Sequence, residues 1–201
     1  MAIRLADVSL KYGEKQIFDR FNLTLPEQGL VCFFGPSGCG KTSLLRLLAG
    51  LSVPDSGALS GLNSLKPSMV FQENRLLPWL TASENVSLVL PECDAVAAHG
   101  WLEQVELGAE ADKLPRQLSG GMQRRIALAR ALAYGGDMLL LDEPFTGLDT
   151  ALAERLLRLI ARLYAGKLIV MITHDKHLSL MADHLYTVEG LPFTLSRARF
   201  P

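Results

Sequence analysis

A strand, a glycine-rich loop and a helix follow one another over residues 30–51, and this run constrains the fold more than any other part of the chain. Residues 30–34 read Leu-Val-Cys-Phe-Phe, an apolar run typical of a parallel strand that is buried on both faces. Gly-Pro-Ser-Gly-Cys-Gly-Lys-Thr occupies 35–42, and leucines recur at helical spacing from Thr42 to Leu51. A buried strand that leads at once into a helix predicts an α/β fold with a mainly parallel sheet.

The loop at 35–42 has the pattern Gly-x-x-x-x-Gly-Lys-Thr, which binds the phosphates of a nucleoside triphosphate. Its glycines let several backbone amides turn toward one anion, and the following helix adds its positive N-terminal end. Lys41 can reach the β- and γ-phosphates, and the Thr42 hydroxyl is the expected Mg²⁺ ligand. A glycine-rich turn that ends in Lys-Thr by chance is the alternative, and the flanking strand and helix argue against it. The residues expected around the phosphates are Gly35, Pro36, Ser37, Gly38, Cys39, Gly40, Lys41, Thr42 and Ser43.

A second apolar run, Met138 to Leu141, ends in the acidic pair Asp142-Glu143. A carboxylate at the end of a strand parallel to the first can reach the Mg²⁺ shell, so Asp142 is the expected metal ligand. Glu143 is one residue further on, where it can polarise an attacking water molecule. Two acids that merely solvate a strand end would be a plausible alternative, but not beside the phosphate loop.

Ser119, Gly120 and Gly121 precede a strongly helical stretch from Met122 to Ala133. Ser119 has the character of an N-cap, and the glycines leave the backbone amides open, which predicts a second helix start able to bind an anion. Without the other motifs, an ordinary capped helix would be the better interpretation.

Together these motifs resemble the ATP-binding-cassette (ABC) ATPases, and the resemblance runs nearly end to end. Residues 118–123, Leu-Ser-Gly-Gly-Met-Gln, look like the signature loop of that family, although Met stands at the fifth position where Gln is usual. Gln72 looks like the Q-loop residue, Gly147-Leu148-Asp149 like the D-loop, and His174 like the switch histidine. Alone, Gln72, His174 and Tyr12 would each be better interpreted as surface or core residues; six motifs in the family's order make coincidence negligible.

The resemblance implies a role for each matched residue, with ATP and Mg²⁺ as cofactors. Glu143 would orient water and His174 would contact the γ-phosphate. Gln72 would bind Mg²⁺ or the water and sense a membrane partner, and Tyr12 would stack on adenine. Two copies of the chain would pair head to tail, so that each ATP lies between the phosphate loop of one and the signature loop of the other. The residues implied on the signature side of that interface are Ser119, Gly120, Gly121, Gln123 and Asp149.

The family also implies a fold: a phosphate-loop core with a mainly parallel sheet, an N-terminal antiparallel β subdomain, and an inserted helical subdomain. We expect one domain over 1–201, with the helical subdomain at about 74–134. The expected elements are antiparallel strands within 3–25, strands ending near Gln72 and at 137–141, 168–172 and 184–188, and helices at 81–90, 94–107, 150–165 and 176–182.

Residues 72–86 include the apolar sequence Leu-Leu-Pro-Trp-Leu-Thr, which is similar to the corresponding sequence in importer ATPases for nitrate, sulfonates and taurine. An apolar surface stretch usually marks a partner, and in the family this region receives a helix of a transmembrane permease subunit. Packing of these side chains inside the subdomain is the alternative. The resemblance implies a solute-binding protein in the full system and a peripheral location on the cytoplasmic side of the inner membrane.

Composition and motifs together exclude several classes of protein. The net charge of −1 gives no basic field for nucleic acid, and no apolar run reaches the roughly 18 residues of a membrane span. A soluble, non-transport ABC ATPase of DNA maintenance would carry a long coiled coil, which the chain lacks. An exporter or lipid-releasing ATPase would use the same chemistry and stays open. A nucleotide kinase would not explain the signature loop.

Overall fold

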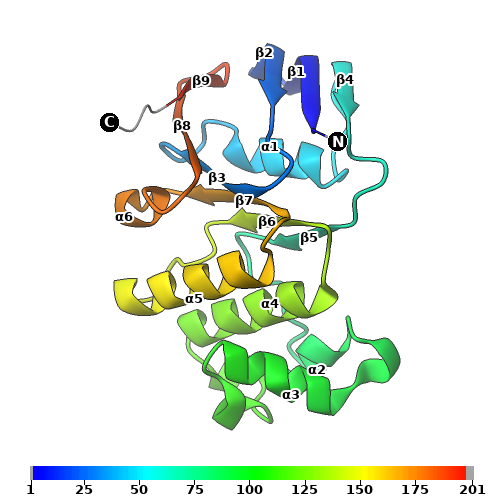
Figure 1. The fold of residues 1–201 in the computed structure, drawn as a ribbon, viewed down its shortest axis with the longest axis vertical. Helices are drawn as coiled ribbons and strands as arrows, with labels where there is room; N and C mark the ends of the chain where they lie inside the picture. The colour runs from blue at the N-terminus through cyan, green and yellow to red at the C-terminus, as the bar shows by residue number, and fades with distance from the viewer. Residues whose placement is uncertain (1, 198–201) are drawn as a thin grey trace.

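The computed structural model describes residues 2–197, and these residues form two sheets separated and covered by helices (Figure 1). The larger sheet has six strands in the order β5-β6-β7-β3-β8-β9. Neighbouring strands from β5 to β8 are parallel, and β9 pairs antiparallel with β8. The strands of this sheet are β3 (Gly29–Phe34), β5 (Pro67–Val70), β6 (Met138–Asp142), β7 (Leu168–Thr173), β8 (His184–Glu189) and β9 (Thr194–Arg197).

The smaller sheet is antiparallel and has the order β2-β1-β4. Its strands are β1 (Arg4–Tyr12), β2 (Lys15–Thr24) and β4 (Ser56–Ser60). β1 and β2 form a hairpin because apolar and polar residues alternate and Gly13 takes a left-handed backbone in the turn, at φ 58°. This sheet lies beyond helix α1 (Lys41–Leu48), on the side of the molecule that carries the N-terminus (Figure 1).

The remaining helices lie on the opposite face of the large sheet (Figure 1). Two long helices pack directly below it, and two shorter ones extend the molecule further, while a last short helix follows β7 at the edge. These helices are α4 (Gly120–Tyr134), α5 (Thr150–Leu163), α2 (Ala82–Ser87), α3 (Ala95–Gln104) and α6 (Lys176–Ser179), with single 3-10 turns at Pro91–Cys93, Gly108–Glu110 and Pro115–Gln117. None of the helices within residues 2–197 is long and apolar enough to cross a membrane.

Both faces of the large sheet are buried, which explains why its strands read as continuous apolar runs. Along β3, Leu30 and Cys32 belong to the core shared with α4 and α5, while Val31 and Phe33 belong to the core shared with α1 and the small sheet. The alternation along one strand thus joins two hydrophobic cores through a single sheet.

The fold class predicted from the sequence is confirmed, and the differences lie at the ends of elements. The first helix was expected to continue to Leu51, which is wrong: α1 ends at Leu48. Gly50 takes φ 68°, its N–H donates to Leu47 O, and the N–H of Leu51 donates to Arg46 O. This arrangement is a Schellman ending, which a left-handed glycine favours.

Other helices are also shorter than their patterns predicted, because capping side chains and turns define their ends more sharply than periodicity does. The helix expected at 176–182 covers only Lys176–Ser179, the one expected at 81–90 covers Ala82–Ser87, and the one expected at 94–107 covers Ala95–Gln104. β9 was not predicted. The expected domain range of 1–201 includes residue 1 and residues 198–201, which lie outside the described residues.

The hairpin of β8 and β9 reaches back to the small sheet. Phe193 lies between these strands, its N–H donates to Ile17 O at 2.8 Å, and its ring packs edge-on against Phe18 and Phe21 at centroid distances of 5.1 and 5.2 Å. A Cβ atom on Gly40 would lie 3.3 Å from this ring. The hairpin therefore packs against the glycine-rich loop at Gly40.

Candidate active site

A cavity of about 270 Å³ opens where the carboxyl ends of the parallel strands meet the glycine-rich loop. In open α/β sheets, ligands bind beyond this edge. The residues that line the cavity are Tyr12, Lys15, Ile17, Ser37, Gly38, Gly40, Lys41, Thr42, Ser43, Gln72, Asp142, Glu143 and Ile172. Segments predicted separately from the sequence therefore meet around one space.

The glycine-rich loop needs its glycines for the backbone they adopt. Gly38 has φ 80° and Gly40 has φ 99°, both in the left-handed region. Gly40 is also the N-cap of α1 and offers no side-chain hydrogen bond, and a Cβ atom there would lie 2.7 Å from the Ile17 side chain. The first N–H groups of α1 are consequently left for an anion in the cavity.

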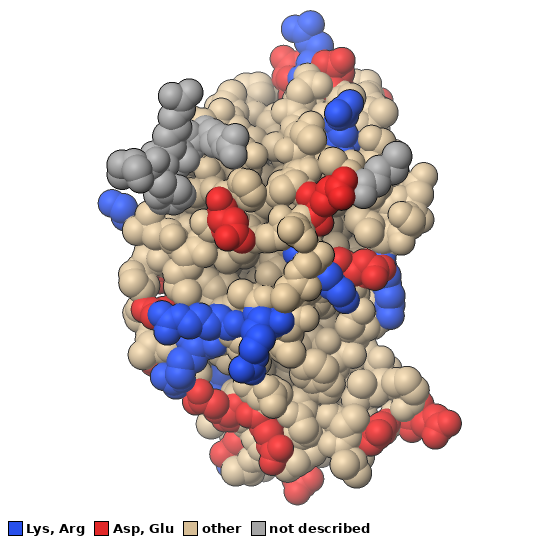
Figure 2. All heavy atoms as spheres, viewed as in Figure 1, with Lys and Arg blue, Asp and Glu red and all other residues tan. Residues whose placement is uncertain are grey.

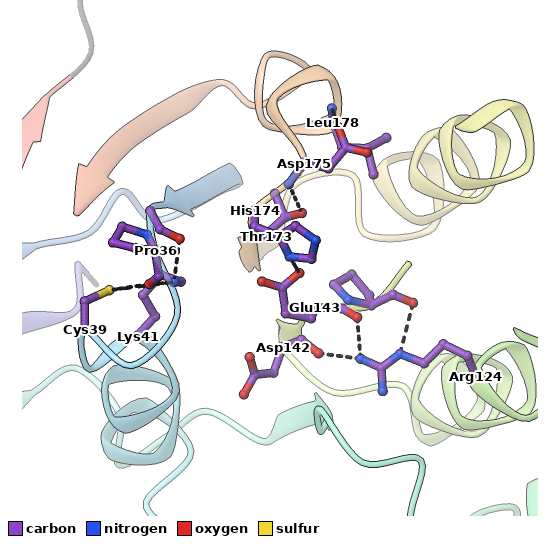
Figure 3. Close-up of polar contacts among 12 residues, drawn as sticks. Pro36, Cys39, Lys41, Arg124, Asp142, Glu143, Thr173, His174, Asp175 and Leu178 are labelled. Carbon is purple, nitrogen blue, oxygen red and sulfur yellow. Dashed lines mark hydrogen bonds and ion pairs between the residues drawn. The ribbon is translucent and has the colours of Figure 1, made fainter. Parts of the chain in front are cut away.

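Lys41 is almost fully buried, and its ammonium group rests on the loop itself (Figure 3). Its Nζ atom donates to Gly35 O at 2.8 Å and to Pro36 O at 2.6 Å, and lies 3.7 Å from Cys39 Sγ. The buried thiol of Cys39 donates to Pro36 O at 3.0 Å. Gly35, Pro36 and Cys39 thus contact Lys41 and do not line the cavity.

Thr42 and Asp142 are brought together by α1 and β6. The Thr42 hydroxyl donates to Asp142 Oδ2 at 2.8 Å, and Asp142 is only 2% exposed. Burial raises the pKa of the Asp142 carboxyl above its ordinary value, as does Glu143, against the lowering effects of the Thr42 hydrogen bond, Arg124 and Lys41. A hydroxyl and a carboxylate oxygen at the cavity wall are hard ligands of the kind that Mg²⁺ takes, together with water and phosphate.

Glu143 and His174 form the second polar pair of the site (Figure 3). Glu143 Oε2 lies 2.9 Å from His174 Nδ1, although the glutamate follows β6 and the histidine follows β7. Glu143 has φ 50°, which is uncommon for a residue with a side chain, and its N–H donates to Ile172 O at 3.0 Å. The carboxylate reaches the cavity, whereas His174 is not among the residues that line it.

The remaining predicted site residues lie apart from the cavity. Ser119 caps α4 as expected, since its Oγ accepts from Met122 N at 3.2 Å, and Gly120 beside it is exposed. Gln123 donates to Pro115 O at 2.9 Å and to Leu118 O at 3.2 Å, so its amide braces its own loop. The signature residues Ser119, Gly120, Gly121 and Gln123 and the D-loop residue Asp149 do not line the cavity.

Asp149 has a structural contact of its own at the start of α5. Its Oδ1 atom accepts from Leu152 N at 2.9 Å, which makes it the N-cap of this helix, and the residue is otherwise exposed. The capping contact uses one of the two carboxylate oxygens of Asp149.

Sequence reasoning missed four residues, one of which is Ile172 at the wall of the cavity. Lys15 and Ile17 line the cavity, and Lys15 Nζ donates to Gly38 O at 3.4 Å, because the β1–β2 hairpin reaches the loop. Arg124 is buried behind Asp142 and Glu143. One signal could have found Arg124: it stands four and eight residues before Leu128 and Leu132, so a charge falls on the apolar face of its helix.

On the face drawn in Figure 2, charges of both signs lie side by side. Lys and Arg atoms gather over α5, whose exposed arginines are Arg155, Arg158 and Arg162. Two of these are paired, Arg155 with Glu106 at 3.1 Å and Arg158 with Glu154 at 2.8 Å. The charge on this face is therefore mixed, in keeping with the net charge of −1.

Comparison with known proteins identifies the family. Residues 18–146 match the family model described as ABC transporter. The chain is 40% identical over 199 residues to an aliphatic sulfonates import ATP-binding protein, SsuB 3, of Paraburkholderia xenovorans, covering 94% of this chain and 78% of that protein. A similar protein of Burkholderia ambifaria is 40% identical over 180 residues, which are 87% of this chain and 56% of that one.

The fold agrees with the sequence comparison. The chain superposes with a TM-score of 0.84 and 31% identity on a solved ATP-binding cassette, MJ0796, described as the dimeric post-hydrolysis state bound to ADP and Pi. The match covers 92% of this chain and 93% of that one. The chain belongs to the ABC transporter family and is one of its ATP-binding, ATP-hydrolysing cassettes.

Proposed function

We propose that this chain is the subunit that hydrolyses ATP to power an ABC importer of a small solute. The observation that carries the ATPase role is the meeting of Thr42, Asp142 and Glu143 around one cavity at the phosphate loop. The importer role is supported by 40% identity, along 94% of the chain, to a protein named for aliphatic sulfonate import. Aliphatic sulfonates are therefore the first solutes to test.

Mg²⁺ would be held by the Thr42 hydroxyl and the Asp142 carboxylate, with Gln72 at the same cavity as a further oxygen ligand. When bound, the ion neutralises charge on the β- and γ-phosphates. Burial of Asp142 favours this use, because a carboxylate kept from water gains most when a cation reaches it.

The protein's own groups would bind the phosphates, orient the attacking water and hold the adenine. Ser37, Gly38 and Gly40 leave their amides to the phosphates, and Lys41 would move its ammonium from the loop carbonyls to the γ-phosphate. Glu143 would orient the attacking water and His174, bonded to it, would contact the γ-phosphate. Tyr12, which is 46% exposed at the cavity, would stack on adenine.

A second copy of the chain would complete the site. Ser119, Gly120, Gly121 and Asp149 lie apart from the cavity at helix starts, and two solved cassettes of similar fold are described as dimeric. These residues would contact the ATP held by the partner copy, and Gln123 would contribute by bracing the signature loop. ATP would then hold two identical surfaces together, and its hydrolysis would release them.

Residues 72–86 would contact the transmembrane permease. Trp79 within this region is 70% exposed. A second cavity, of about 270 Å³, has apolar walls that include Leu51, Met69 and Phe71, the last of which directly precedes this region in the chain. An exposed apolar side chain and an apolar cavity are both features that suit the docking of a helix from the partner. We place the subunit peripherally on the cytoplasmic side of the inner membrane, as part of a system with a solute-binding protein.

We further propose that residues 1–201 act as one domain, with residues 74–134 as a helical subdomain. Within this range α2, α3 and α4 pack on one another and share one core with the lower face of the large sheet. A helical unit that carries both the signature loop and the permease contact can relay movement between them.

Co-purification from solubilised membranes tests the transport role. Tagged wild-type chain is expected to bring down a multi-span permease, identified by mass spectrometry. Trp79→Ser is expected to lose the permease while retaining ATPase activity. Leu180→Ser, which alters a leucine that is 52% exposed on another face, serves as the matched control and retains both. ATPase activity with no membrane partner for the wild-type chain would refute the transport role.

A further inference from the structure

Arg124 is a charged residue buried between helix α4 and the carboxyl ends of β5 and β6. The residue is 3% exposed and shares a helical face with the buried Leu128 and Leu132. Burial lowers the pKa of its guanidinium, whereas Asp142 and Glu143 raise it. A buried cation of this kind persists only when nearly all of its N–H groups have acceptors.

One set of acceptors follows β6 (Figure 3). Arg124 Nε donates to Pro144 O at 3.2 Å, and Nη2 donates to Glu143 O at 2.6 Å and to the carbonyl of Asp142. These three residues are consecutive, and two of them carry the carboxylates of the site. The guanidinium therefore fixes the backbone on which both carboxylates stand.

The other set follows β5. Nη1 of Arg124 donates to Gln72 O at 3.1 Å, to Asn74 Oδ1 at 3.3 Å and to the carbonyl of Phe71. Arg130, further along the same helix, donates to Asn74 O at 3.2 Å. Helix α4 thus holds the segment of Gln72 as well as that of Glu143, and Arg124 donates hydrogen bonds to both.

The backbone of Glu143 explains why such a clamp is needed. Its φ of 50° is a left-handed conformation, which a residue with a side chain keeps only when its surroundings determine it. Its N–H is held by Ile172 O at 3.0 Å, and its C=O is held by Arg124. With both peptide groups fixed, the carboxylate is directed toward His174 and the cavity.

The same helix begins at the exposed signature residues. Ser119 caps α4, and Arg124 lies little more than one turn after that cap, within continuous helix. Because the helix is rigid, a displacement of its N-terminus also displaces the side chain of Arg124. The planar guanidinium would then move the segments of Gln72 and Glu143 together.

We propose that Arg124 is a positioning residue that sets Glu143 and Gln72 together and links them to the exposed start of α4. The inference rests on the proposed role of Glu143 in orienting water. It follows that Arg124 governs the rate of hydrolysis and has little effect on the binding of ATP, whose phosphate loop it does not touch.

Steady-state kinetics of Arg124→Lys test this. Lysine keeps the positive charge but replaces the planar guanidinium by one ammonium group, which cannot reach both the segment of Gln72 and that of Glu143. We expect kcat to fall about 10²-fold, the scale of a small misplacement of a catalytic group, with KM for ATP within about threefold of wild type. Arg125→Lys is the matched control on the same helix, because Arg125 donates to Val105 O and Glu106 O, away from the site. It should leave both constants unchanged.

A milder variant covers the case in which Arg124→Lys does not fold. Asn74→Ala removes the side-chain oxygen that accepts from Arg124 and should lower kcat about threefold, the scale of one hydrogen bond, at unchanged KM. Unchanged kcat in Asn74→Ala together with a misfolded Arg124→Lys contradicts the inference. A normal kcat in folded Arg124→Lys, or equal losses in Arg124→Lys and Arg125→Lys, also contradicts it.

Glu143→Gln, measured in the same series, separates this inference from the proposed function. Wild-type turnover in Glu143→Gln would refute the proposed function itself. Loss of turnover in Glu143→Gln beside normal kinetics in Arg124→Lys would refute only the role of Arg124.

Discussion

Nδ1 of His174 lies 2.9 Å from Oε2 of Glu143, although the two residues follow different strands of the large sheet. The glutamate side chain is 15% exposed and the histidine side chain 66%, so the pair runs from the cavity to the surface. Glu143 is held in a left-handed backbone, whereas His174 stands at a loop. The carboxylate is the more buried partner and the imidazole the more exposed one.

This relationship predicts the effect of His174→Ala. Without the imidazole, the carboxylate loses its partner and, under the proposed role of His174, the γ-phosphate would lose a contact, while the phosphate loop is untouched. We expect kcat to fall about 10²-fold or more and the affinity for ATP to stay near that of wild type. His99→Ala, on the exposed side of α3, is the control. Weakened ATP binding in proportion to kcat would contradict the assignment.

The hydrogen bond between Thr42 and Asp142 predicts how Thr42 variants respond to Mg²⁺. Thr42→Val keeps the shape but removes the hydroxyl, so the Mg²⁺ concentration for half-maximal ATPase activity should rise at least about 10-fold. Thr42→Ser keeps the hydroxyl and should stay near wild type. A titration of ATPase activity with Mg²⁺ measures this, and equal curves for the two variants would exclude Thr42 as a ligand.

The raised pKa of Asp142 predicts a gain in stability when its charge is removed. The pKa of Asp142 is higher in the folded state than in the unfolded state, so the fold favours the protonated carboxyl. This contribution to stability is fully present at a pH below the unfolded-state pKa, and it is lost as the pH rises through the folded-state pKa. Asp142→Asn should therefore melt at a higher temperature than wild type at pH 7, without Mg²⁺ or nucleotide, and should lose ATPase activity.

Thermal melts at several pH values check this expectation. The difference between Asp142→Asn and wild type should shrink as the pH approaches the ordinary pKa of an aspartate, where the wild-type carboxyl is already protonated. Asp112→Asn, at an exposed position, should melt as wild type throughout. A lower melting temperature for Asp142→Asn at pH 7 would show that the charged form is stabilised in the fold.

Head-to-tail pairing predicts complementation between two inactive variants. Ser119→Asp keeps an N-cap but brings a negative charge toward the partner's ATP, and Lys41→Ala weakens the phosphate loop. In a mixed dimer, one site combines the intact phosphate loop of the first variant with the intact signature loop of the second. An equal mixture should recover at most about a quarter of wild-type turnover. A mixture as inactive as each variant alone would argue for sites built within single chains.

The parallel core and its phosphate loop could be predicted because their signals are local. Leu30 to Phe34 reads as a strand buried on both faces, and Gly38 and Gly40 in the loop after it take left-handed backbones. Helix ends were less predictable, because the stop at Gly50 depends on two hydrogen bonds that periodicity does not record. β9 was missed because four residues are too few for a clear alternation.

In the candidate site, too, the residues of local motifs could be predicted, whereas residues placed by tertiary packing could not. Motif residues such as Thr42 and Asp142 were predicted to meet, and the structure brings them to 2.8 Å. Lys15 was missed because its place at the cavity depends on how the β1–β2 hairpin packs on the core. Arg124 was missed because most of its acceptors are backbone carbonyls, which carry no sequence signature.

On the proposed mechanism, Glu143 drives hydrolysis of an ATP held between two copies of the chain. The most direct test measures turnover and molar mass in solution for Glu143→Gln, with Glu103→Gln as the control at an exposed position. We expect Glu143→Gln to bind MgATP, to lose about 10²-fold or more of its turnover, and to double its mass from 22.0 kDa when MgATP is added. Wild-type turnover in Glu143→Gln, or a mass that stays at that of one chain when ATP is saturating, would contradict the account.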